Sequence, residues 1–382
     1  MTKPDKSKKT LGIFSAASFL NDLGAEMLFP IWPLFVRNFL GLPLSFLGVV
    51  DGLGDALNAI SQVFSGYFSD RFKKRKPFIS AGYFLAFLGR LGVSFSAGPG
   101  SLIGFRSLDR LGKLRDAPRD AYLAEEYERK ERGTSFGILR AFDNLGAVFG
   151  ILASLALFPL LGFRPLIMLA ALPTLFSVIL VTGFIRERHN GRVAFHGIHF
   201  KDFSKPLKRL FASVAVFALG LFSYSFVLIG AEELGFSQRN VIVLYLVFTL
   251  SSVFAAVLAG RLSDKIGRKW TLGMSYIFWM IPLAGFIFLA SGAAVWLLFV
   301  AYGFFKGSFE TVSRVFAADL APAELAGSIL GSLQLVMGLL AFPASFLAGI
   351  LWDAFGFRAP FAVSLLLSFI SLIILLSVKE QR

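Results

Sequence analysis

Long apolar runs separated by short polar segments cover the chain from residue 11 to residue 378. Each run approaches or exceeds the roughly 20 residues that an α-helix needs to cross about 30 Å of hydrocarbon. A backbone in lipid must satisfy its own hydrogen bonds, so these runs predict helices, and the alternating pattern of a membrane barrel is absent. The pattern predicts twelve spans, at residues 11–37, 44–69, 77–97, 100–125, 134–159, 164–185, 208–231, 238–262, 270–290, 293–319, 326–352 and 358–378.

The composition agrees with a membrane protein, and the sequence contains no motif of an enzyme. Of the 382 residues, 56% are hydrophobic and 16% are charged, whereas soluble domains contain about a quarter charged residues. The chain has no cysteine, so disulfides and thiolate metal sites are excluded. No phosphate-binding loop pattern and no nucleophile–base set occur in the sequence, and the three histidines lie between residues 189 and 199. We therefore expect no enzymatic activity, no cofactor and no metal.

The distribution of positive charge predicts the orientation in the membrane. The formal net charge of +14 is concentrated in the N-terminal tail and the even-numbered loops, for example at residues 71–76, 129–132 and 265–269. Odd-numbered loops carry at most one Lys or Arg each, and cytoplasmic loops are the ones enriched in these residues. We expect an integral protein of the cell (inner) membrane with both termini in the cytoplasm. We also expect a monomer in the lipid bilayer that binds no nucleic acid.

The two halves of the chain repeat at an offset of 194 residues. The segment 66–71 reads GYFSDR and matches GRLSDK at 260–265, and GFR at 162–164 matches GFR at 356–358. These matches fall at equivalent loops, so the repeat predicts two similar six-helix bundles, at residues 1–185 and 208–382, joined by a cytoplasmic linker at 186–207. Transporters bind their solute near the midplane of such a repeat interface.

The duplicated loop resembles the signature of the major facilitator superfamily, roughly G-x-x-x-D-R-x-G-R-[RK]. The first copy departs from this pattern at Lys73, where the second copy has Gly267. The resemblance implies an all-α membrane fold of twelve helices in two pseudo-symmetric bundles. It also implies that the signature aspartates meet a helix N-terminus of the opposite bundle and gate the cytoplasmic side. The gating residues are then Gly66, Asp70, Arg71, Gly260, Asp264, Lys265 and Arg268.

Two further segments resemble a prokaryotic branch of that superfamily. The first helix contains NDLGAEMLFPIWP at residues 21–33, which is similar to the branch pattern N/T-D-x-x-x-E-M-x-x-P-x-x-P. The fourth helix contains RDAPRD at residues 115–120, which is similar to R-x-A-P-R-D. The branch resemblance implies transport and says little about the solute.

Charged residues inside the predicted spans are the candidate functional residues. A charge at mid-bilayer costs at least about 2.5–3.5 kcal/mol, so such residues must face a cavity or be paired. Asp22 and Glu26 share one face of the first helix, and Asp51 and Asp55 share one face of the second. Proton coupling or solute binding competes here with structural pairing to the basic residues of the fourth helix.

The fourth helix contains more charged residues than any other predicted span. Six charged residues share one face at helical spacing: Arg106, Asp109, Arg110, Lys113, Asp116 and Asp120. Arg115 and Arg119 lie well round the helix. Pro118 predicts a kink, because it leaves the carbonyl of Leu114 without its helical donor. The proton-coupling or solute residues are predicted to be Asp22, Glu26, Asp51, Asp55, Asp109, Arg110, Lys113, Arg140, Asp143 and Glu310.

Three functions remain open on the sequence. The leading hypothesis is proton-coupled export of a small organic solute, because carboxylates are clustered at mid-membrane. The alternative is an uptake symporter or uniporter of a polar or anionic metabolite, with Arg110, Lys113 and Arg140 binding the solute. The remote alternative is a transporter-derived sensor. In the fifth helix, Ile151 stands where drug exporters of the superfamily carry a proline, which weakens a drug-export assignment.

Overall fold

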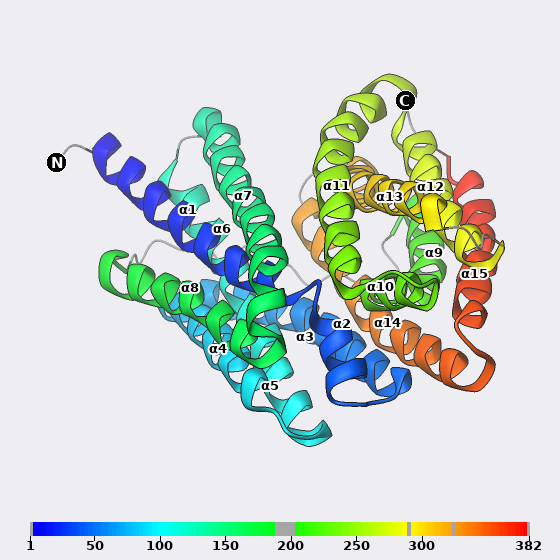
Figure 1. The fold of residues 1–382 in the computed structure, drawn as a ribbon. Coiled ribbons are helices and arrows are strands. Elements are labelled where there is room, and N and C mark those ends of the chain that lie inside the picture. Colours follow the sequence, from blue (N-terminus) through cyan, green and yellow to red (C-terminus); the bar gives the residue numbers. More distant parts are fainter. Residues whose placement is uncertain (1–2, 128, 188–202, 289–291, 323–324, 380–382) are drawn as a thin grey trace. The chain divides into compact units, whose positions relative to one another are not determined.

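In the computed structural model, the described residues are 3–127, 129–187, 203–288, 292–322 and 325–379, and every regular element among them is a helix (Figure 1). The elements of the first half are α1 (Lys3–Leu28), α2 (Trp32–Leu34), η1 (Phe35–Phe39), α3 (Leu44–Arg71), α4 (Lys76–Phe95), α5 (Pro99–Leu111), η2 (Gly112–Arg115), α6 (Asp116–Glu126), α7 (Arg129–Leu161) and α8 (Phe163–Phe184). The second half contains α9 (Lys205–Gly220), α10 (Tyr224–Glu233), α11 (Gln238–Ile266), α12 (Arg268–Phe288), α13 (Gly292–Asp319), α14 (Ala326–Phe355) and α15 (Arg358–Leu376).

These elements form the twelve predicted spans, because three spans are composite. The first span continues from α1 through η1, the fourth runs through α5, η2 and α6, and the seventh joins α9 to α10. Within the described residues, nine helices are long and apolar enough to cross a membrane by composition. The three remaining spans are the first, second and fourth, which carry most of the charged residues predicted to be functional.

The chain divides into two compact units, and α3 contributes to both. Unit 1 contains residues 1–40 and 57–194, and unit 2 contains residues 41–56 and 195–382. The first half of α3 thus packs with the C-terminal helices, a pairing that the 194-residue repeat does not indicate. Most of the predicted linker at 186–207, with its three histidines, lies outside the described residues.

Each unit has its own hydrophobic core. In unit 1, α1 packs against α7 and α8, and buried residues such as Phe14, Tyr83 and Tyr122 form the core near one end of these helices. In unit 2, α13 packs against α11 and α12 around buried aromatic rings, among them Phe217 and Tyr276, which stack with centroids 4.1 Å apart. The second unit therefore has an aromatic core.

Glycines let the first half of α3 lie directly on α14 within unit 2. A Cβ atom at Gly52 would lie 2.7 Å from the Cα of Phe342, closer than real Cβ contacts, so only glycine fits there. At the start of α3 the backbone N–H groups of Leu44 and Ser45 donate to the Asp353 carboxylate at 3.2 and 2.8 Å. A carboxylate at a helix N-terminus satisfies open donors and interacts favourably with the helix dipole.

Lys73, the departure from the signature glycine, adopts a left-handed backbone conformation. Its φ angle is +54°, and the matching Gly267 of the second copy has φ +99°. The residue at this position therefore has a positive φ in both copies, but the turns differ, because residues 72–75 separate α3 from α4 and Gly267 alone separates α11 from α12. The lysine adopts its conformation with strain. The left-handed conformation costs an L-residue about 1–2 kcal/mol, and glycine would remove this strain. The greater conformational entropy that glycine loses on folding would offset about 0.5–1 kcal/mol of that gain.

Replacing Lys73 with glycine is therefore expected to raise the free energy of unfolding by up to about 1 kcal/mol. The matched control is Lys74→Gly, at a neighbouring position without positive φ, where the same change should destabilise the protein. The unfolding temperatures of the wild type and both purified variants, measured in detergent, give their order of stability. A Lys73→Gly variant with a lower unfolding temperature than the Lys74→Gly variant would contradict the inference that Lys73 is strained.

Candidate functional site

A polar cavity of about 130 Å³ lies inside unit 1, between the first, third and fourth spans. It is smaller than the roughly 300–1,000 Å³ typical of sites for drug-sized ligands, which suits a small solute. Its wall combines carboxylates, cations and a single aromatic ring. The lining residues are Asn21, Asp22, Ala25, Glu26 and Phe29 of the first span, Arg90 of α4, Asp109 and Arg110 of α5, and Lys113 and Arg115 of η2.

Arg90 joins four helices at one wall of the cavity. It is 4% exposed, and its Nε donates to Asp109 Oδ1 at 3.0 Å. Its Nη1 donates to the backbone oxygen of Asn21 at 2.8 Å and to Thr174 Oγ1, and its Nη2 donates to Asn21 Oδ1 at 3.2 Å. Gly24 permits this approach, because a Cβ there would lie 3.1 Å from Arg90 Nη1. The guanidinium thereby fixes the position of α1 against α4, α5 and α8.

Asp109 lies between two buried arginines. Its second oxygen pairs with Arg106 Nη1 at 3.0 Å, opposite the pair with Arg90. The Arg106 guanidinium also lies 4.1 Å from the centroid of the Trp32 ring, and the Arg110 guanidinium lies 4.9 Å from that of Phe29. Aromatic faces attract cations, so these rings help hold two positive charges inside the span.

The fourth span changes helix type in its centre, so the single helical register used for the sequence prediction does not run through it. Residues Gly112–Arg115 form a 3-10 turn, and α6 begins at Asp116. Pro118 then lies in the first turn of α6, where its missing N–H removes no helical bond. A 3-10 helix turns about 20° more per residue than an α-helix, so four residues rotate the following segment by roughly 80°.

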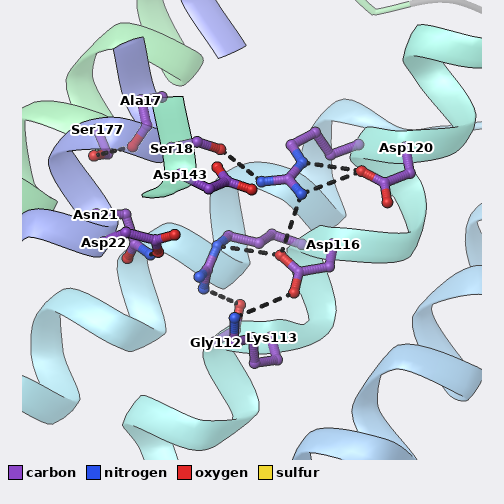
Figure 2. A network of polar contacts seen from close by, with 12 residues as sticks. Ala17, Ser18, Asn21, Asp22, Gly112, Lys113, Asp116, Asp120, Asp143 and Ser177 are labelled. Carbon is purple, nitrogen blue, oxygen red and sulfur yellow. Dashed lines mark hydrogen bonds and ion pairs between the residues drawn. The ribbon is translucent and has the colours of Figure 1, made fainter. Parts of the chain in front are cut away.

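This rotation brings Arg115 and Arg119 into the interior, although helical spacing predicts that they lie well round the helix. Both are buried, at 3% and 4% exposure. Arg115 donates to the Gly112 oxygen at 2.7 Å and lies 3.6 Å from Asp116, and Arg119 donates to Ser18 Oγ on α1 at 2.6 Å (Figure 2). The two arginines therefore connect the fourth span to itself and to α1.

Carboxylates extend this set of ion pairs to α7. Arg119 contacts Asp120 at 3.2 Å (Figure 2). Arg140 of α7 bridges Asp120 at 3.6 Å and Asp143 at 3.2 Å. Lys113 lies 3.5 Å from Asp116. Asp22 accepts a hydrogen bond from Asn21 Nδ2 at 2.8 Å.

We call the charged residues around the cavity and these ion pairs the unit 1 charge network. Its six carboxylates belong to Asp22, Glu26, Asp109, Asp116, Asp120 and Asp143. Its seven cations belong to Arg90, Arg106, Arg110, Lys113, Arg115, Arg119 and Arg140. The network contains seven of the ten residues predicted to serve proton coupling or solute binding.

The remaining three predicted residues lie in unit 2. Asp51 is 3% exposed and accepts hydrogen bonds from Ser223 Oγ at 2.7 Å and Ser225 Oγ at 2.5 Å, where the seventh span breaks. Asp55 interacts electrostatically with Lys306, which pairs with Glu310 at 2.8 Å. These carboxylates form a second polar group, apart from the cavity of unit 1.

The signature loops place each aspartate beside an arginine of its own unit. Asp70 pairs with Arg75, which also contacts Glu125 at 2.8 Å. In unit 2, Arg268 contacts Asp264 at 2.5 Å and Asp319 at 3.0 Å. Of the other predicted gating residues, Arg71 donates to Tyr67 at 3.1 Å, Lys265 lies exposed at the end of α11, and a Cβ at Gly66 or Gly260 would meet only ordinary contacts.

The comparison with known families matches both halves of this arrangement. A sequence model described as Major Facilitator Superfamily matches residues 14–230 and again residues 210–382. The protein belongs to the Major Facilitator Superfamily. It is therefore an integral membrane transporter, and the superfamily is not a family of enzymes.

Relatives within the superfamily differ in what their names say they transport. The chain is 34% identical over 356 residues to an uncharacterised MFS-type transporter of Methanocaldococcus jannaschii, covering 90% of this chain and 88% of that protein. It is 26% identical to the multi-drug resistance efflux pump PmrA of Streptococcus pneumoniae, over 72% of each chain. It is 26% identical to the cis,cis-muconate transport protein of Acinetobacter baylyi, over 72% of this chain and 70% of that one.

Solved structures of superfamily transporters share the fold at low sequence identity. A bacterial homologue of the human lysosomal transporter Spinster, in an inward-facing and unoccupied conformation, matches with a TM-score of 0.80 at 15% identity, over 98% of this chain and 97% of that one. The nucleoside transporter NupG matches with a TM-score of 0.79 at 12% identity, over 97% of this chain and 100% of that one. These likenesses support the twelve-helix fold of the superfamily.

Several residues of this superfamily member were not among the predicted site residues. Arg90 had a visible signal, because it is the single charge inside the apolar run at 77–97. Ser223, Ser225 and Asp353 had none, since serines occur throughout the spans and Asp353 lies near a predicted span end. Their roles depend on contacts between segments far apart in the chain.

Proposed function

We propose that the protein is a proton-coupled secondary transporter, in which Asp22 and Glu26 bind the proton and the unit 1 cavity binds the solute. One observation carries the proposal: both carboxylates lie on the first span at a small cavity between three spans, beside the cations Arg110 and Lys113. Intramembrane carboxylates that line a cavity are typical of proton relays in transporters. A proton and a solute that bind at the same cavity interact electrostatically, which is the physical requirement for coupling.

Two directions of transport follow from this site. Export by proton exchange is supported by the names of two relatives, PmrA and the fosmidomycin resistance protein of Escherichia coli, which is 22% identical over 85% of this chain. Uptake by proton co-transport is supported by the name of the muconate transport protein and by the cations at the cavity. Both directions use the same carboxylates and differ in whether proton and solute bind together or in turn.

The function is tested with the full chain in proteoliposomes that contain a pH-sensitive dye. Candidate solutes are added outside, one at a time, without an imposed gradient. We expect a transported solute to change the internal pH, with acidification for co-transport and alkalinisation for exchange. Solute entry at an unchanged internal pH, measured with radiolabel, would leave a uniporter in place of a proton-coupled transporter.

The orientation is part of the proposal, with both termini in the cytoplasm. The native chain has no cysteine, so single cysteines are clean reporters. Lys205, at the start of α9, and Ala97, between α4 and α5, are both exposed. A cysteine at position 205 should be labelled only from the cytoplasm and one at position 97 only from outside, and the reverse pattern would contradict the orientation.

A further inference from the structure

The unit 1 charge network is out of balance by one positive charge. Its seven cations face six carboxylates, so with every group ionised one positive charge remains. The cavity lining by itself carries the same excess, because the cations Arg90, Arg110, Lys113 and Arg115 face the carboxylates Asp22, Glu26 and Asp109 there. Arg90, Arg106, Arg115 and Arg119 are between 1% and 4% exposed, so these four charges are removed from water, whereas the Arg140 side chain is 57% exposed. A buried charge is strongly unfavourable unless a counter-charge neutralises it.

The excess charge can be met at the cavity. Four of the seven cations, Arg90, Arg110, Lys113 and Arg115, line it, while Arg106, Arg119 and Arg140 lie at the ion pairs beyond. Guanidinium groups bind carboxylates and similar anions in two-bond geometry, and lysine adds a point charge. The cavity also presents the apolar groups of Ala25 and Phe29 on the side of the first span.

We propose that the unit 1 cavity binds a small monoanion, of the chemical class of a short organic acid, whose negative charge neutralises the network. The proposal deepens the proposed function and rests on it, because it names the class of solute that the same cavity takes. The anionic group lies toward Arg110 and Lys113, and the apolar part lies toward Ala25. A solute with a positive charge is disfavoured, because it would add to the excess.

The sign of the imbalance also determines how proton and solute are coupled. Protonation of Asp22 or Glu26 removes a negative charge and makes the network more positive, so it strengthens the binding of an anion. Anion binding in turn favours protonation, because linkage between two ligands is reciprocal. Proton and solute therefore bind together and cross together, which selects co-transport over exchange.

The experiment is thermal unfolding of the purified full chain in detergent, with sodium sulfate as the background salt at constant ionic strength. The probes are lactate, benzoate and chloride as monoanions, choline as a cation and glucose as a neutral solute. We expect at least one monoanion to raise the unfolding temperature in a saturable manner, while choline and glucose do not. Stabilisation by choline, or the absence of stabilisation by all three monoanions, would overturn the proposal.

A pair of matched variants separates charge balance from general stability. Lys113→Gln removes one cation from the network, and Arg239→Gln removes an exposed cation at the start of α11. We expect Lys113→Gln to weaken monoanion binding at least about tenfold, equivalent to about 1.4 kcal/mol, and to raise the unfolding temperature of the protein without added monoanion. Arg239→Gln should leave both unchanged. Wild-type monoanion affinity in Lys113→Gln would contradict the assignment.

The outcomes also distinguish this proposal from the proposed function. If no monoanion binds, but another solute changes the internal pH of proteoliposomes, the solute class is wrong and the proton coupling stands. If monoanions bind and enter the vesicles without a pH change, the solute class stands and the proton coupling is wrong.

Discussion

Replacement of Arg90 by methionine is expected to lower the free energy of unfolding by about 3–5 kcal/mol. The methionine fills a similar volume but removes four hydrogen bonds, which join α4 to Asn21 on α1, Asp109 on α5 and Thr174 on α8. The Asp109 carboxylate then keeps only one of its two buried ion pairs, the one with Arg106. Thermal unfolding in detergent and the amount of protein in the membrane measure the loss.

Arg140→Met is the matched control for this variant. The Arg140 side chain is 57% exposed, and exposed ion pairs contribute about 0–1 kcal/mol. Arg90→Lys should fall between the two, because an ammonium keeps the charge but cannot reproduce the planar, forked contacts of the guanidinium. An Arg90→Met protein that unfolds at the wild-type temperature would show that the buried pair with Arg106 alone holds the fourth span.

Removal of the carboxylates that we propose to bind the proton is expected to abolish accumulation driven by a pH gradient. At one proton per solute, a gradient of one pH unit drives about a tenfold accumulation, because it corresponds to about 1.4 kcal/mol. Asp22→Asn and Glu26→Gln are made singly, and in at least one of them the ratio should fall from about ten to about one. Exchange of labelled for unlabelled solute, which needs no net proton movement, should continue in that variant.

Glu131→Gln is the control for these two variants. Glu131 is an exposed acid in the first turn of α7, and its neutralisation should leave the accumulation ratio unchanged. If both variants accumulate solute as the wild type does, the coupling carboxylate is elsewhere, and Asp51 and Asp55 in unit 2 are the next to test.

The span pattern was predictable because it depends on local composition. Runs of apolar residues predict helices wherever they occur, and even the charged fourth span was found from its position between two apolar spans. The repeat at 194 residues aligns Lys73 with Gly267, and both residues have a positive φ, although the turns around them differ in length.

The site was only partly predictable, because its geometry depends on small departures from regular helices. One 3-10 turn at Gly112–Arg115 is enough to bring Arg115 and Arg119 into the interior. A helical wheel assumes regular α-helical spacing, so it does not predict this turn. Likewise, Asp51 meets Ser223 and Ser225 only because α3 packs against the break of the seventh span, a contact over more than 170 residues. Spacing predicted which helix faces are polar, and long-range packing decides which charges meet.

The division of α3 between the two units predicts how two fragments of the protein behave when the chain is cut between them. A transporter split between residues 188 and 202 would leave α3 whole on the first fragment, while residues 41–56 belong to the unit that the second fragment forms. Those residues would still form hydrogen bonds with Asp353, Ser223 and Ser225 of the other polypeptide. The two halves made as separate chains should therefore assemble and copurify, because the first half of α3 binds noncovalently to the second fragment.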